Sequence, residues 1–313
     1  MADRKMYQNI AECFQKQDEV ILETILEGPH AGEKRMLSRE EGNCLPENGV
    51  YREVLYGKPK AVVCGGGHVS LSIVQLLKML EFRVIVVDER PEFANRERFP
   101  QADEIFCMEF TDFFRENDFG NHAYYVIVTR GHQYDYSCLK AVLERERDYV
   151  GMIGSRSKVA LSFEKLRKEG YAEEVIGRIH SPIGLAIGAK TPTEIGVSIA
   201  AEIIQEKNRQ PRNTLEASIL EGIQDEDAHT MVTVIEKSGS SPRGEGTRMI
   251  VCKDGKIYGT IGGGSVEYAA IQEAKAFDDP SGFAIKEYNL SNSKAATLGM
   301  VCGGQVKVLF EKL

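Results

Sequence analysis

The 313-residue sequence lacks the cysteine patterns that build disulfide frameworks and zinc sites. Its seven cysteines are scattered along the chain, and no two of them form a CxxC pair or a Cys/His ligand spacing. We therefore expect no metal site and no disulfide scaffold. Most of these cysteines should fill the core or lie on the surface without a role.

The chain also lacks a surplus of positive charge and any long apolar run. With 39 Lys and Arg against 47 Asp and Glu, its net charge of −8 argues against a nucleic-acid surface. No run of about 18 apolar residues is present to span a bilayer. The first residues, Met1 to Tyr7, lack the apolar core of a signal peptide, so a cytoplasmic location is expected. The length allows two compact domains.

The clearest pattern begins at residue 60. A short apolar run, Ala61–Cys64, is followed by Gly65-Gly-Gly-His68 and then by helical periodicity from Val69 to Leu80. A second apolar run, 83–88, ends in Asp88 about twenty residues after the glycines, the spacing of a dinucleotide-binding fold. Strand, glycine turn, helix, strand and acid in this order predict a Rossmann-type domain.

The residues of this turn have expected roles in binding a nucleotide. Gly65 permits the tight turn, Gly67 lets backbone N–H groups approach a pyrophosphate, and a helix starting near His68 directs its positive end there. Asp88 would accept a hydrogen bond from a ribose hydroxyl. The sequence leaves open whether a nucleotide is bound.

Further strands and helices alternate up to residue 154. Strand 123–129, helix 135–147 and strand 149–154 indicate a parallel sheet, and ligands of such sheets collect at the carboxyl ends of the strands. The candidate ligand-binding residues at those ends are Arg130, His132, Ser155 and Arg156. An alternative of equal weight is that His68 and His132 only cap helices or bond to backbone, and that Ser155 is a helix N-cap.

A loop of small and polar residues precedes the last helix of this domain. Residues 180–190 include Ser181, Pro182 and Lys190, and we expect them to form a rim of the site. Thr191 should cap the following helix. The polar stretch 207–214 predicts a linker, which ends the Rossmann-type domain (57–206) and starts a smaller domain (215–313).

The smaller domain contains two segments suited to an anion. Strands are predicted at 230–236, 249–252, 256–261 and 306–310, with helices at 218–225 and 265–276. Loop 238–248 offers hydrogen-bond donors from Ser240, Ser241, Arg243 and Arg248, with a plain solvated hairpin as the alternative. The turn of Gly262, Gly263 and Gly264 leads into a helix that Ser265 is expected to cap, which makes a second anion-binding turn.

Residues 19–37 weakly repeat the pattern of residues 229–250. Both segments consist of a strand, a glycine-containing loop, an Arg-Met pair and a second strand. Residues 1–56 are therefore interpreted as a degenerate partial copy of the small domain, with coincidence as the alternative. The predicted fold class is α/β: a Rossmann-type parallel-sheet domain plus a smaller α+β domain.

Together these segments resemble the XdhC/CoxI family, accessory proteins that mature xanthine and carbon monoxide dehydrogenases. The resemblance extends from about residue 51 to the end, and its motifs are Gly65–Val69, Val87–Phe93, Gly151–Arg156, Pro182–Pro192, Gly239–Gly244, Gly259–Gly264 and Met300–Gly304. This chain departs from the family in two respects. The complete small domain follows the Rossmann-type domain, whereas family members commonly have it first, and Ser265 stands where the family often has cysteine.

The resemblance implies that the chain binds the molybdenum cofactor in its molybdopterin form. The cofactor would be protected while a cysteine desulfurase supplies its terminal sulfur, and then delivered to a xanthine dehydrogenase-type molybdenum hydroxylase. Loop 238–248, the glycine turn at 262–264 and the thiol of Cys302 would supply its donors and one soft ligand. A buried, structural Cys302 is the alternative. The Rossmann-type domain would hold NAD(P), another nucleotide or none.

Two other functions stay open at this point. One is an NAD(P)-dependent oxidoreductase with His68 or His132 as general acid, and the other is a docking scaffold without a ligand. No Ser/Lys/Tyr or His/Asp constellation recurs at a defined spacing, so we assign no catalytic residue and favour a non-catalytic chaperone. The two copies of the small domain also predict a homodimer.

Overall fold

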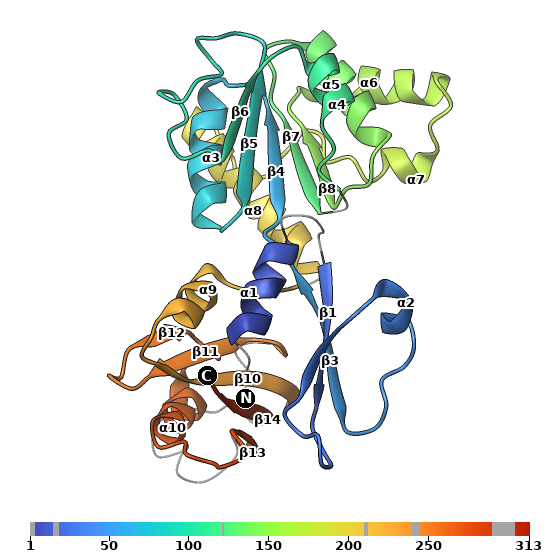
Figure 1. Cartoon of the computed structure of the whole chain (residues 1–313). Coiled ribbons are helices and arrows are strands. Elements are labelled where there is room, and N and C mark those ends of the chain that lie inside the picture. Colours follow the sequence, from blue (N-terminus) through green and yellow to red (C-terminus); the bar gives the residue numbers. More distant parts are fainter. Residues whose placement is uncertain (1–3, 15–18, 121, 210–211, 240–243, 290–303) are drawn as a thin grey trace. The chain divides into compact units, whose positions relative to one another are not determined.

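The structure is a computed structural model and describes residues 4–14, 19–120, 122–209, 212–239, 244–289 and 304–313. The chain divides into two compact units (Figure 1). We call Lys58–Pro211 the Rossmann unit, and Met1–Gly57 together with Arg212–Leu313 the composite unit.

The Rossmann unit is a five-stranded parallel sheet with helices on both faces. Its elements are β4 (Lys60–Cys64), α3 (His68–Met79), β5 (Arg83–Asp88), β6 (Glu104–Cys107), α4 (Phe110–Glu116), β7 (Ala123–Ile127), α5 (His132–Leu143), β8 (Tyr149–Met152), α6 (Arg156–Lys168), α7 (Glu173–Ile176) and α8 (Pro192–Arg209). The strand order is β6-β5-β4-β7-β8 (Figure 1). The direction of winding reverses between β4 and β7, and in such sheets the crevice for a ligand opens at the carboxyl ends of the two strands where this happens.

Alternate side chains of β4 enter two separate cores. Val62 and Cys64 pack in the core that includes α4, α5 and α6, whereas Ala61 and Val63 pack in the core that includes α3 and α8. A strand covered on both faces needs apolar residues at every position, which explains the uninterrupted apolar run in the sequence. The predicted strand, glycine turn, helix and second strand are confirmed here.

The composite unit is built from two segments that are far apart in the sequence. Its elements are α1 (Arg4–Cys13), β1 (Glu19–Ile25), β2 (Lys34–Leu37), α2 (Arg39–Gly42), β3 (Val50–Tyr56), β9 (Asn213–Thr214), α9 (Ala217–Gln224), β10 (Ala228–Gly239), β11 (Arg248–Cys252), β12 (Ile257–Gly259), α10 (Gly264–Lys275), β13 (Phe283–Asn289) and β14 (Gly304–Lys312). They form the sheets β2-β1-β3-β9 and β12-β11-β10-β14-β13. One core joins α1, β1 and β3 to α9, β10 and β11, and a second core packs α10 on β10, β11 and β14.

The two segments that resemble each other in sequence form matching antiparallel hairpins. In the first hairpin Met36 pairs with Leu22 and Arg35 with Glu23. In the second, Met249 pairs with Val232 and Arg248 with Thr233. The Arg-Met pair thus takes the same register in both hairpins.

The predicted boundaries around this copy need correction. Residues 1–56 do not stand apart, because Tyr7 and Leu22 share one core with Ile219 and Met231 of the second segment. Most of the described part of the predicted linker 207–214 is regular structure: α8 continues to Arg209, and β9 pairs in parallel with β3. Among the described residues, none of the helices has both the length and the apolar character needed to cross a membrane.

Candidate functional site

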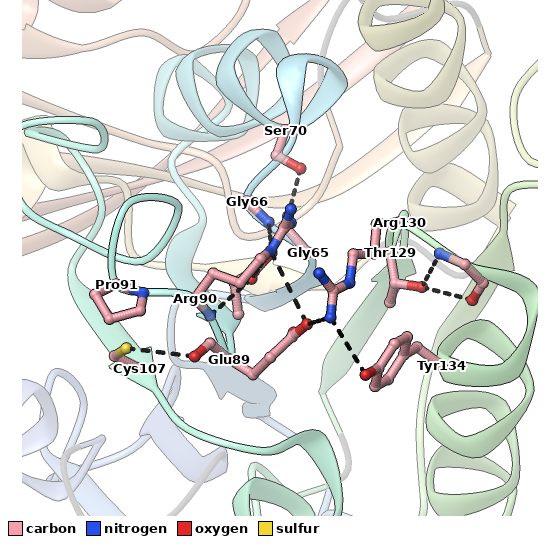
Figure 2. A network of polar contacts seen from close by, with 12 residues as sticks. Gly65, Gly66, Ser70, Glu89, Arg90, Pro91, Cys107, Thr129, Arg130 and Tyr134 are labelled. Atoms are coloured by element: carbon pink, nitrogen blue, oxygen red, sulfur yellow. Dashed lines mark hydrogen bonds and ion pairs between the residues drawn. The ribbon is translucent and has the colours of Figure 1, made fainter.

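The carboxyl edge of the Rossmann sheet brings together polar residues that follow three neighbouring strands. The glycine turn Gly65–Gly67 follows β4, Asp88 and Glu89 lie at the end of β5, and Arg130 follows β7 (Figure 2). The N-termini of α3 and α5 begin at the same edge, at His68 and His132. The structure therefore brings these candidates to the same edge of the sheet.

The first two glycines of the turn are required by the packing of the chain itself. Gly65 has φ +107°, and a Cβ added there would lie 2.5 Å from the carbonyl oxygen of Val128. A Cβ on Gly66 would lie 2.1 Å from the carbonyl oxygen of Phe93. Only Gly67 has no heavy atom within 4 Å of its added Cβ, so it alone provides open space for a ligand.

The backbone N–H groups of Gly65 and Gly66 are likewise engaged within the chain. The Gly65 N–H donates to Val87 O (2.8 Å), and the Gly66 N–H donates to Asp88 Oδ2 (2.8 Å). A phosphate would therefore depend on the amides from Gly67 onward, which belong to the unsatisfied first turn of α3.

Asp88 takes a different role from the one expected. Its carboxylate is 1% exposed and accepts four hydrogen bonds, one from Gly66 N–H and three from the backbone N–H and guanidinium of Arg90, at 2.8–3.0 Å. A carboxylate has about four acceptor positions, so none remains for a ribose hydroxyl. Burial raises the pKa of Asp88, but the bonds from Arg90 and Gly66 outweigh it and leave this pKa below its usual value.

The adjacent Glu89 and Arg130 form an ion pair across the crevice. Arg130 Nη2 lies 2.9 Å from Glu89 Oε1, and the Arg130 guanidinium also lies over the Tyr134 ring, 5.3 Å from its centroid (Figure 2). Sequence reasoning selected Arg130 but missed Glu89 and Arg90. The sequence did indicate them, because three consecutive charged residues, starting at Asp88, directly follow the apolar run of a predicted strand.

The two histidines lie at helix starts, and within the described residues neither hydrogen-bonds to a carboxylate. The carboxylate of Asp135, on the same helix as His132, instead accepts from Thr129 Oγ1 (2.6 Å) and from Thr129 N–H (3.2 Å). Burial raises the pKa of Asp135 despite these bonds. Both interpretations of His68 and His132 therefore stay open.

Two predicted helix caps are confirmed on the same edge. Ser155 Oγ accepts from the Lys158 N–H (3.5 Å) at the start of α6, where Arg156 is the exposed first residue. Thr191 Oγ1 accepts from the Glu194 N–H (3.3 Å), while Glu194 Oε2 accepts from the Thr191 N–H (3.0 Å).

The predicted rim, residues 180–190, is held by a buried carboxylate on α8. Glu202 Oε2 accepts from the Gly184 N–H (2.9 Å) and from Tyr149 Oη (2.6 Å), and its Oε1 lies 3.4 Å from His180 Nδ1. Burial raises the pKa of Glu202, but the contacts with His180, Tyr149 and Gly184 together leave it lowered. The rim is thereby fixed to the helix beneath it.

In the composite unit the glycine turn at 262–264 is already filled by the chain. All three glycines have positive φ, at 121°, 77° and 72°, as an anion-binding turn requires. The carboxylate of Glu267 accepts from the N–H groups of Ile261 (2.9 Å) and Gly263 (3.1 Å), and from Thr260 Oγ1. The N-cap of α10 is Gly263, so the expectation that Ser265 caps this helix is wrong, and Ser265 lies inside its first turn.

Arg248 also differs from its expected role. Its side chain is 2% exposed and forms an ion pair with Glu53, and its Nη1 donates to Gly246 O (2.7 Å). Nη1 and Nη2 of this guanidinium are thus engaged within the fold, whereas its buried Nε has no hydrogen-bond partner among the described residues. The other candidates of this unit, Ser240, Ser241, Arg243 and Cys302, lie outside the described residues.

These features define a Rossmann-type fold combined with a second, composite unit. Residues 61–203 match the family described as the XdhC Rossmann domain, and residues 223–289 match the XdhC and CoxI family. The chain belongs to the XdhC/CoxI family. The Rossmann match precedes the XdhC and CoxI match along this chain.

Two curated relatives and one solved structure are similar to this chain. The Escherichia coli (strain K12) protein named "Uncharacterized protein YqeB" is 37% identical over 161 residues, 49% of this chain and 28% of that protein. A Bacillus subtilis (strain 168) protein, named as a probable subunit of xanthine dehydrogenase, is 32% identical over 154 residues, 49% of this chain and 44% of that protein. The matches thus span less than half of either relative. A crystal structure of a xanthine dehydrogenase (BH1974) from Bacillus halodurans shares the fold, with a TM-score of 0.56, 23% identity and coverage of 66% of this chain and 67% of that one.

Proposed function

We propose that this protein is an accessory protein of a xanthine dehydrogenase-type molybdenum hydroxylase, and that it binds the molybdenum cofactor in its molybdopterin form. A cysteine desulfurase would supply the terminal sulfur while the cofactor is bound. The observation that carries the proposal is the presence of both XdhC/CoxI matches in one chain. The Bacillus subtilis relative, with its name of a probable xanthine dehydrogenase component, supports the choice of target.

The carboxyl edge of the Rossmann unit fits the phosphate end of such a cofactor. Gly67 leaves open space at the N-terminus of α3, and Arg130 beside it is 49% exposed. Arg98 donates from Nε to Gly66 O (2.7 Å), and within the described residues its buried Nη2 has no hydrogen-bond partner. An unsatisfied guanidinium nitrogen beside the turn is a further donor for an anion.

The bound cofactor would supply the molybdenum centre that the target hydroxylase uses. This chain's own part would be to hold the phosphate through the α3 amides and Arg130, and to keep the cofactor oriented. Cys302, Ser240 and Ser241 are proposed as ligand residues on the strength of the family resemblance alone, and they lie outside the described residues. In the described part of the composite unit, Glu267 fills the glycine turn and Arg248 pairs with Glu53.

The test is cofactor retention after anaerobic incubation and desalting, measured as molybdenum and oxidised pterin. The natural chain should retain both, and Cys302→Ala should retain less molybdenum than the matched variant Cys44→Ala, whose thiol is exposed. Equal retention by both variants would keep the function and remove Cys302 from the site. Absence of retention by the natural chain would refute the proposal.

We also propose that the protein acts as a homodimer, on the basis of its two related hairpins. Light scattering at working concentration should give twice the chain mass of 34.9 kDa. A monomeric mass would refute this assignment.

A second candidate function is an NAD(P)-dependent oxidoreductase. The reversal of strand order between β4 and β7 favours it, because dinucleotides bind at this position in Rossmann folds. It requires NAD(P)H binding, which the quenching or enhancement of the reduced nicotinamide fluorescence would detect. A chain that binds neither nucleotide nor cofactor would be a docking scaffold.

A further inference from the structure

Glu89 is a buried carboxylate placed between two arginines of the crevice. Its side chain is 10% exposed, and its Oε1 lies 2.9 Å from Arg130 Nη2 and 3.9 Å from Arg90 Nε. Glu89 follows β5 and Arg130 follows β7, the strands on either side of β4. The Glu89–Arg130 contact therefore connects the segments that follow β5 and β7, on either side of the strand that leads into the glycine turn (Figure 2).

This carboxylate is poorly satisfied. Although Oε1 is within ion-pair distance of Arg130, it is buried and has no aligned hydrogen bond to any residue that the structure describes. A buried carboxylate oxygen without a hydrogen bond is costly, because it has lost its water and gained no donor in return. The contact is thus a charge attraction that another anion could replace.

The two arginines are prepared for such an anion in different ways. Arg90 is fixed, because it forms a two-pronged pair with Asp88 and stacks 3.7 Å from the centre of the Phe93 ring. Arg130 is 49% exposed and is held by Glu89 and by Tyr134 Oη (3.3 Å). One guanidinium is preorganised beside the turn, and the other can move to meet a ligand.

We propose that Arg90 and Arg130 form an anion subsite for a phosphate group, and that Glu89 occupies this subsite until a phosphate displaces it. The inference rests on the proposed ligand-binding role of the carboxyl edge and names the residues that select its ligand. A phosphate suits two guanidinium groups because it carries up to two charges and accepts paired N–H donors. Nucleotides and phosphorylated pterins share this chemistry.

The experiment measures binding of inorganic pyrophosphate, ADP and NADP⁺ to the full chain by isothermal titration calorimetry. Glu89→Gln should bind about tenfold more tightly, since Arg130 then no longer has to leave Glu89 before it meets the anion, and tenfold corresponds to about 1.4 kcal/mol. Arg130→Gln should bind about tenfold more weakly. The double variant should match Arg130→Gln alone, because Glu89 acts by holding Arg130.

Matched variants separate this effect from a change in net charge. Glu97→Gln removes one negative charge from an exposed position of the same loop, and Arg167→Gln removes a cation that is also 49% exposed. Neither should change the affinity by more than about twofold. If Glu89→Gln lowers the melting temperature, Arg130→Gln still tests the subsite, because Arg130 is half exposed and its replacement should leave the fold intact.

The outcomes distinguish the sources of the phosphate. Pyrophosphate binding that responds to Glu89 and Arg130 supports the subsite, and tighter ADP or NADP⁺ binding with the same response assigns it to a nucleotide. Unchanged or weaker binding by Glu89→Gln would overturn the proposal, as would equal gains in the control Glu97→Gln. Absence of binding by every variant would overturn it too, even if the chain retained the molybdenum cofactor after desalting.

Discussion

Replacing Arg248 by glutamine should destabilise the composite unit, because it leaves a buried carboxylate without its counterion. Arg248 and Glu53 have side chains only 2% and 5% exposed, and the remaining donor to Glu53 is Asn213 Nδ2 (2.6 Å). Removing one member of a buried ion pair costs about 3–5 kcal/mol. For a unit of this size each kcal/mol lowers the melting temperature by about 2–4 °C. The expected decrease is therefore about 6–20 °C.

The assay is thermal unfolding by circular dichroism, combined with hydrogen exchange read by mass spectrometry. Exchange should accelerate in β10 and β11 and stay unchanged in the Rossmann unit. Arg39→Gln is the matched control, because the Arg39–Glu19 pair is exposed (74% and 29%) and such pairs contribute about 0–1 kcal/mol.

A contrary result would restore the ligand role for Arg248. If Arg248→Gln unfolds like the natural chain and loses cofactor retention, the guanidinium serves the ligand and the burial argument is wrong. If stability falls while retention per folded molecule is unchanged, the structural role stands.

Three further predictions concern the turns and the buried acid. Asp88→Asn should lower the melting temperature of the Rossmann unit at pH 7. Because the folded pKa of Asp88 is depressed, its stabilisation is present above the ordinary value near 4 and is lost as the pH falls through the lower folded value. The two melting curves should converge on acidification, and a constant gap would contradict this. Gly65→Ala should cost more than about 2 kcal/mol, whereas Gly67→Ala should melt normally and weaken phosphate binding; equal melting temperatures would contradict the different space around these residues. Glu267→Ala should cost about 1–2 kcal/mol by leaving the amides of its glycine turn unpaired, and unchanged unfolding in urea would refute that role.

The Rossmann unit could be predicted closely because its signals are local. The turn after β4 needs Gly65, the apolar run of β5 ends at Asp88, and the predicted helix caps involve residues only three positions apart. Predicted boundaries of 57–206 lie within five residues of the observed 58–211. Local order of strand, turn and helix is sufficient to specify such a sheet.

The errors arose where a side chain's partner is set by packing. Asp88 was expected to face a ligand, but the loop after β5 folds back and saturates it with Arg90. Arg248 lies 195 residues from Glu53, so no spacing in the sequence relates them. Glu267 was within reach of sequence reasoning, since an acid in the first turn of a helix can accept from the unpaired N–H groups of the preceding turn.

The parallel pairing of β3 with β9 has a consequence for how the chain is made. Leu55 pairs with Asn213 and Tyr56 with Thr214, so the whole Rossmann unit is an insertion between two neighbouring strands. During synthesis on the ribosome the Rossmann unit emerges complete and can fold at once. In the first segment, Val20, Leu22 and Leu55 cannot be buried in their core until Ile219 and Met231 have been translated. Residues 19–56 are thus synthesised before the Rossmann unit but buried after it.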